Sequence, residues 1–148
     1  MILKILISLA AIVVVLAVVI ALRPTEFRVE RTATMAAPAP VVFGVGAIYT
    51  WSGNNEVGEG RTTIIESRPS ELIRVRLEFV RPFAATSTAT FTFRSEGERT
   101  AVTWSLDGGN SFPAKAMGLV MNIDKMIGDD FEKGLAQLKV MAEAAPRS

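Results

Sequence analysis

The sequence contains no cysteine, no histidine and almost no excess of charge of either sign. Without cysteine there are no disulfides and no thiol nucleophiles. Without either residue there are no zinc sites of the Cys/His kind and no imidazole general bases. We therefore expect no metal site and no cofactor. The 16 basic and 15 acidic residues give a net charge of +1 without a basic cluster, which argues against nucleic acid as a partner.

The most conspicuous feature that is present is an apolar run, Ile5–Leu22, which contains no charged residue. A helix of this length spans about 27 Å, close to the hydrocarbon thickness of a bilayer. We expect residues 1–23 to form an uncleaved anchor that makes the protein a single-pass protein of the cell membrane. Two alternatives are a cleaved signal peptide, for which Lys4 would supply a minimal basic region, and a helix buried in the core.

The side of the membrane that the remaining chain faces stays open. Arg23, Arg28 and Arg31 follow the apolar run, and an excess of basic residues after a span favours the cytoplasmic side. The short tail before the run carries Lys4 and resembles an export signal, which favours the opposite side.

Between the anchor and the C-terminal part, apolar and polar residues alternate with the period of two that is typical of half-buried strands. Tight turns separate the alternating segments, so consecutive strands are expected to pair as an antiparallel meander. The six expected strands span Phe27–Met35, Ala47–Trp51, Gly58–Glu66, Leu72–Val80, Thr86–Arg94 and Ala101–Leu106.

The connection after the first strand predicts only the beginning of a helix. Val41, Val42 and Phe43 follow an Ala-Pro pair and would form a first helical turn. Gly44 and Gly46 are then expected to end it, because glycine is a poor helix former.

The last long segment, Phe112–Glu143, has the periodicity of an amphipathic helix with a wide apolar face. A turn at 107–111 and Pro113 mark its start. Three glycines lie within it, and we expect a bend near Gly128. Such a helix would cover one face of the strands. The sequence therefore predicts an α+β fold, in which an antiparallel sheet grips a long C-terminal helix and one transmembrane helix precedes both.

Three stretches resemble a known family: YTWSGNNEVGEGR at 49–61, EFVRPF at 78–83 and DKMIGDDFEKGL at 124–135. They are similar to membrane-anchored bacterial members of the polyketide cyclase/dehydrase-like, or SRPBCC, group of the START-like helix-grip superfamily. The resemblance implies that residues 24–148 form a START-like domain. This superfamily holds lipid carriers, cyclases, hormone receptors and co-chaperone-like domains on one fold, so the fold alone does not assign an activity.

The chain also departs from the family pattern. Family members continue after the Val-Phe pair through two helices and a strand, whereas this chain passes from Phe43 to Gly46 directly. The domain is therefore expected to lack most of the usual first helices and the second strand. A sheet edge without its neighbour invites pairing with another chain, so we expect self-association through an uncovered sheet edge.

The candidate ligand-binding residues lie on the concave face of the sheet and the inner face of the C-terminal helix. An ordinary filled core is the alternative for the same positions. The expected lining residues are Phe91, Phe93, Trp104, Ile123, Ile127 and Phe131.

The catalytic candidates are weaker, because without histidine only Asp130, Asp124 and Tyr49 remain. Asp130 is the most informative, because on a regular helix it falls about 50° from the centre of the apolar face. A carboxylate there would be paired, exposed at the mouth of a cavity, or raised in pKa. An ion pair with Arg74 or Arg76, or a bend at Gly128 that lets Asp130 reach water, would explain it structurally.

The resemblance implies membrane-anchored binding of a small apolar or lipid-like ligand, with no demonstrated catalysis. A cyclase or dehydratase acting on a polyketide-like substrate is the enzymatic alternative, and it needs an ionisable pair that faces the cavity. A protein-interaction module is the third, and it would show as an exposed apolar patch.

Overall fold

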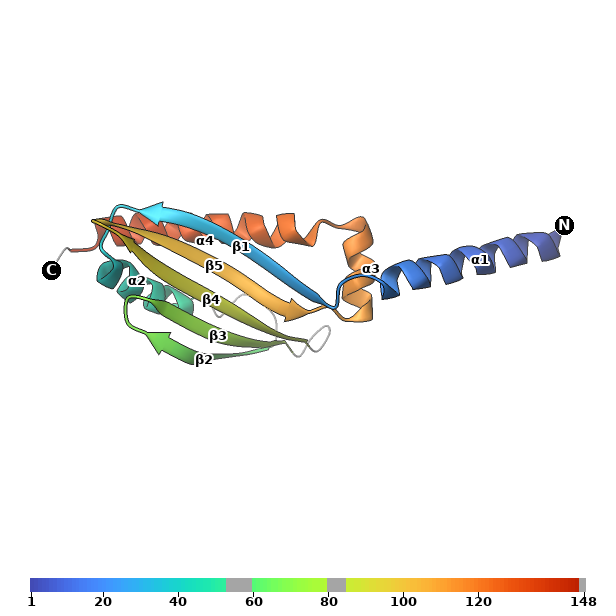
Figure 1. Cartoon of the computed structure of the whole chain (residues 1–148), viewed down its shortest axis with the longest axis horizontal. Coiled ribbons are helices and arrows are strands. Elements are labelled where there is room, and N and C mark those ends of the chain that lie inside the picture. The colour runs from blue at the N-terminus through green and yellow to red at the C-terminus, as the bar shows by residue number, and fades with distance from the viewer. Residues whose placement is uncertain (53–59, 80–84, 147–148) are drawn as a thin grey trace.

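The computed structural model describes residues 1–52, 60–79 and 85–146, with side chains described outside 47–61 (Figure 1). A single apolar helix extends away from a sheet that is covered on one face by further helices. The elements in chain order are α1 (Ile2–Ala21), β1 (Glu26–Met35), α2 (Ala39–Ser52), β2 (Gly60–Arg68), β3 (Leu72–Phe79), β4 (Ala85–Glu96), β5 (Arg99–Gly109), α3 (Phe112–Val120) and α4 (Ile123–Ala144).

The sheet is antiparallel throughout, with strand order β1-β5-β4-β3-β2. The meander from β2 to β5 agrees with the alternation in the sequence. The first strand, β1, pairs with the last, β5, and forms one edge of the sheet. Trp104 on β5 lies opposite Arg31 on β1 and Phe91 on β4, and Phe91 lies opposite Ile73 on β3. These four residues therefore point to the same face of the sheet. The predicted α+β fold is confirmed.

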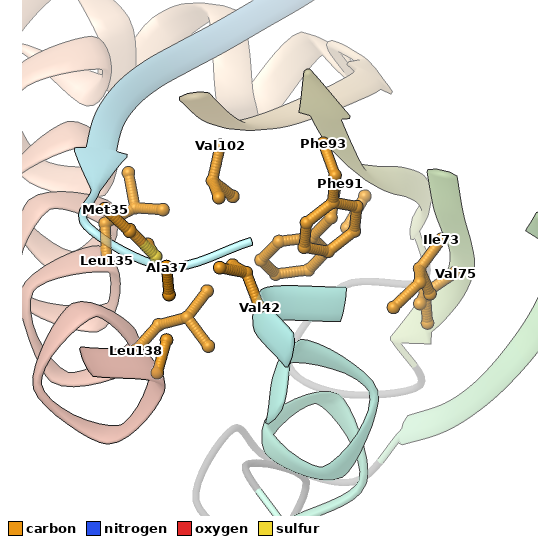
Figure 2. Close-up of a cluster of buried hydrophobic side chains, with 12 residues drawn as sticks. Met35, Ala37, Val42, Ile73, Val75, Phe91, Phe93, Val102, Leu135 and Leu138 are labelled. Carbon is orange, nitrogen blue, oxygen red and sulfur yellow. The ribbon is translucent and has the colours of Figure 1, made fainter. Parts of the chain in front are cut away.

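The core lies on that face, toward the end of the sheet that is far from α1. Side chains from α4, α2 and the sheet converge there (Figure 2). Met35, Val42 and Leu138 are fully buried. The buried cluster consists of Met35, Ala37, Val42, Ile73, Val75, Ala89, Phe91, Phe93, Val102, Leu135, Leu138 and Ala142.

The prediction for the connection after β1 was wrong, because α2 runs without interruption through Gly44 and Gly46. The residues expected to form a strand at 47–51 are helical. Gly46 is buried, and a Cβ atom placed on it would lie 3.0 Å from the ring of Phe93. This glycine lets α2 approach the sheet closely, and that packing outweighs the low helix propensity of glycine. The sheet accordingly has five strands among the described residues, where six were expected.

The long C-terminal helix is interrupted, but not where the sequence predicted. The break lies at Met121–Asn122, where Met121 is extended and the side chain of Asn122 accepts a hydrogen bond from the Lys125 amide at 2.9 Å. Asn122 is thus the N-cap of α4. At Gly128, where a bend was expected, α4 continues without interruption. The result is a short helix, α3, that runs across the direction of α1, at the end of the sheet next to the C-terminal end of α1 (Figure 1).

Helix α1 is long and apolar enough to cross a membrane, and its side chains are exposed along nearly its whole length. Its last residues approach α3, and four residues connect it to β1. Helix α1 and the start of the sheet are therefore closely linked.

Candidate functional site

The predicted ligand-lining residues lie on the inner face as expected, and several of them contact one another. Trp104 stacks between Phe91 and Phe131, with ring centroids 4.7 Å and 4.1 Å apart. The stack joins the sheet to α4 at Phe131. Phe93 meets Phe43 of α2 edge to face at 5.4 Å. At these positions the rings fill the space between the sheet and the helices.

A groove of about 610 Å³ lies instead at the end of the sheet next to α1. It is bounded by the start of β1, by α3 and by the first residues of α4, which Figure 1 shows gathered at this end. Its volume is in the range of small-molecule sites. The lining residues are Arg23, Pro24, Glu26, Phe27, Arg28, Val29, Asn110, Ala114, Lys115, Gly118, Leu119, Val120, Met121, Asn122, Ile123 and Asp124.

Local contacts hold the walls of the groove in place. The side-chain amide of Asn110 donates to the Pro24 carbonyl at 3.3 Å, and its backbone amide donates to the Thr25 carbonyl at 2.7 Å. These bonds tie the end of β5 to the chain that leaves α1. Ser111 then caps α3 by accepting from the Ala114 amide at 3.4 Å. The connection before α3 is therefore built from ordinary turn and cap residues, which were visible in the sequence.

Phe27 packs over a glycine of the neighbouring strand. A Cβ atom on Gly108 would lie 2.7 Å from the Phe27 ring and 2.6 Å from the Ser87 hydroxyl. Because glycine has no side chain, the aromatic ring can lie directly against the sheet on this side of the groove. The sequence had marked Gly108 only as part of a turn.

Arg31 links β1 to α4, a role that the sequence pattern did not indicate. From the inner face of β1 its guanidinium donates to Asp124 at 3.0 Å and to Glu132 at 3.2 Å, both on α4. Gly128 lies between these two acids, and a Cβ atom there would overlap the Arg31 guanidinium. The hydrogen bond to Asp124, with a smaller effect from Glu132, raises the pKa of Arg31. The sequence signal that could have indicated this contact is an arginine at an inward-facing position of β1.

The two catalytic candidates whose side chains are described, Asp124 and Asp130, pair with different partners. Asp124 lies at the groove and accepts a hydrogen bond from Arg31. Asp130 is exposed and pairs with Lys133 at 3.1 Å. It therefore reaches water, as one structural alternative required, and α4 continues through Gly128 as one helix. Arg74 pairs with Glu66 instead. Tyr49 lies in α2 rather than on a strand, and its side chain is outside the described residues.

Ile123 is the member of the expected lining that also lines the groove, and it is half-buried there. Ile127 is half-buried as well, one turn further along α4. Within the described part of the chain, no group of three or more acidic residues is arranged to hold a metal ion.

Comparison with known proteins identifies the fold. No family model and no curated protein matches the chain. Solved structures do: a Mesorhizobium loti protein (TM-score 0.62, 12% identity) and a Thermus thermophilus protein (TM-score 0.52, 17% identity) each cover 82% of this chain and 100% of their own. The Aha1 dimer from Colwellia psychrerythraea (TM-score 0.59, 9% identity) covers 80% of this chain and 97% of its own. The chain has a helix-grip-like fold.

Proposed function

We propose that this protein is a START-like domain of the SRPBCC kind, anchored in the cell membrane by residues 5–22, that binds a small apolar or lipid-like ligand. The ligand site is the groove between β1, α3 and the start of α4. The observation that carries the proposal is the position of this groove, because a space of ligand size with both apolar and polar lining residues adjoins the end of a helix that can cross a membrane.

The composition of the groove supports an amphipathic ligand. Phe27, Leu119 and Ile123 supply apolar surface. The charged lining residues are basic (Arg23, Arg28 and Lys115) and acidic (Glu26 and Asp124). Specific small-molecule sites commonly combine a mostly apolar lining with a few polar groups that fix orientation. A ligand with an apolar chain and an anionic or polar head fits this arrangement.

Photocrosslinking of the full chain tests this proposal. The protein is reconstituted in lipid nanodiscs that contain a fatty acid carrying a photoactivatable diazirine, and the labelled residues are mapped by mass spectrometry. Labelling is expected at groove residues such as Leu119 and Ile123. Labelling of α1 by the same probe serves as an internal reference, because an anchor helix would contact any lipid.

Gly118→Trp provides the decisive variant. Gly118 lines the groove, and a Cβ atom added to it meets nothing within 4 Å, so a large side chain can occupy the open space. Gly44→Trp is the matched control, because Gly44 is also helical with open space at its Cβ and does not line the groove. The groove labels are expected to disappear in Gly118→Trp and to persist in Gly44→Trp. Labelling confined to α1 in the unmodified chain would contradict the proposed site.

A further inference from the structure

Helix α3 exposes an apolar face on the side away from the groove. At about 100° per residue, this outer face is centred opposite Lys115 and Gly118, which line the groove. Lys115 is the only charged residue of the helix. The outer face consists of Phe112, Pro113, Met117 and Val120, of which Val120, in the last turn, also borders the groove.

Much of this face is open to solvent. Phe112 is 55%, Met117 is 45% and Val120 is 84% exposed. The face carries no charge. An uncharged, exposed apolar surface of this kind favours contact with an apolar partner.

The direction of α3 relative to α1 indicates what covers this face. Figure 1 shows α3 running across the direction of α1, at the end of the sheet from which α1 leaves. If α1 spans a bilayer, a helix that crosses its direction lies roughly parallel to the bilayer surface. This is the orientation of interfacial helices, which bury one apolar face at the boundary between headgroups and acyl chains.

The length of the connection keeps α3 close to that surface. The five peptide links from Ala21 to Glu26 span at most about 18 Å when fully extended, and the end of α1 approaches α3 directly. The sheet begins at Glu26 and is tied to the start of α3 through Asn110. The domain therefore cannot move α3 far from the membrane in which α1 lies.

Basic residues at the same end fit an anionic lipid surface. Arg23 is exposed immediately after α1, and Lys115 is half-buried in the wall of the groove. Lysine or arginine next to a membrane interacts favourably with anionic headgroups. Arg23 and Lys115 can therefore contact headgroups at the surface on which the apolar face would rest, while Glu26 and Asp124 at the same end are acidic, so the apolar face carries the argument.

We propose that the outer face of α3 docks on the bilayer that holds α1, so that the groove opens at the level of the lipid headgroups. This inference rests on the proposed anchoring of α1. It adds a second membrane contact, formed by Phe112, Met117 and Val120, and it gives lipid a direct path into the groove.

Single-cysteine labelling of the full chain tests the docking, because the native sequence contains no cysteine. Met117→Cys and Met141→Cys form a matched pair: both replace an exposed methionine outside the groove, 45% exposed on α3 and 42% exposed on α4. Ile12→Cys, near the middle of α1, reports on the anchor. Each variant carries the fluorophore NBD and is reconstituted in phosphatidylcholine/phosphatidylglycerol vesicles, with or without doxyl-labelled lipid as a quencher.

The expected result is strong quenching at positions 12 and 117 and little at 141. Quenching at 12 but no more at 117 than at 141 would overturn the docking and leave the anchoring intact. No quenching at 12 would overturn the anchoring, and the docking with it. A probe at 117 that is shielded from water but not quenched by lipid, together with disulfide crosslinks between copies of Met117→Cys, would show that a second copy covers this face and would also overturn the proposal.

Discussion

The two ends of the helix grip differ in how their apolar side chains are covered. At the end far from α1, Met35, Val42 and Leu138 are fully buried between sheet and helices. At the end near α1, Phe112 and Val120 are largely exposed, and a groove separates α3 from the sheet. At the far end the apolar side chains are buried within the chain, whereas at the near end they are exposed and available to an external partner. The first end maintains the fold, and we infer that the second carries the function.

The aromatic stack marks the boundary between these two ends, and its removal should have the largest effect. Trp104 is partly buried, so Trp104→Ala is expected to lower the free energy of unfolding by up to about 3–5 kcal/mol, the range for large buried aromatic residues. Trp104→Phe should lose less, because a ring between Phe91 and Phe131 is retained. Urea unfolding of the detergent-solubilised protein, followed by circular dichroism, measures both. A loss below about 1 kcal/mol for Trp104→Ala would show that the stack does not join sheet to helix.

A pair of leucines compares the two ends directly. Leu138→Ala at the far end should cost about 2–5 kcal/mol, because it leaves a cavity in a packed core. Leu119→Ala at the groove should cost less than about 1 kcal/mol, because the side chain is already partly exposed. The same unfolding measurement distinguishes the two. Equal costs would contradict the division into a packed end and an open end.

A double-mutant cycle tests the contact of Arg31 with Gly128 near the groove. In an Arg31→Ala background, Gly128→Ala should stabilise the protein by up to about 1 kcal/mol, because alanine is the better helix former. In the native background the gain should be smaller or reversed, since the new methyl group displaces the guanidinium from Asp124 and Glu132. Unfolding midpoints of the four proteins give the coupling. Strict additivity would mean that Arg31 does not occupy this position.

The smallest expected effect is a pH dependence at the exposed first turns of α4. The Lys125 ammonium donates a hydrogen bond to the Asp129 carboxylate, with Nζ and Oδ2 2.7 Å apart. This hydrogen bond lowers the pKa of Asp129 below its ordinary value. Because the folded pKa is the lower one, the pair contributes stability above the ordinary pKa of about 3.9 and loses it as the pH falls below that value. Thermal unfolding of the native protein and of Asp129→Asn should converge in acid. A constant difference down to the lowest pH would exclude this contribution.

The strands could be predicted from the sequence because each of them has one covered face. Ile73 and Val75 alternate with Arg74 and Arg76, and the structure buries the aliphatic pair. The period of two therefore identified all five strands, with β2 (Gly60–Arg68) overlapping the predicted strand Gly58–Glu66, as well as the inward position of Trp104. The apolar helix α1 and the existence of a C-terminal helix were equally accessible, because both depend on long periodic or uniform segments.

The helix α2 could not be predicted in this way, because a glycine within it is required by packing against a residue distant in the sequence. Gly46 lies against Phe93, and Gly128 lies against Arg31. In each case the residue that makes glycine suitable is distant in the sequence, so local propensity suggested a break where packing required a helix. The break at Asn122 had a local signal, an asparagine followed by Asp124 in the first turn, which the apolar periodicity of the longer segment obscured.

The groove could not be predicted for a related reason. Its walls come from the linker after α1, the start of β1, and α3. These segments lie together because β1 pairs with β5, the strand that leads into α3. Ile123 and Asp124 were selected for their places on a helix, and they contribute to this groove from one wall. Self-association through a sheet edge and binding of a ligand stay predictions.

The short connection between α1 and β1 has a consequence for how a ligand would be found. If α1 spans a bilayer, as proposed, a domain whose first strand begins within about 18 Å of the end of α1 samples only a thin layer above that bilayer. A lipid-like ligand in that bilayer would then be encountered by lateral diffusion in two dimensions, at a local concentration set by its fraction in the membrane rather than by its solubility in water. Even a site of modest intrinsic affinity would be occupied under such conditions, and occupancy would follow membrane composition.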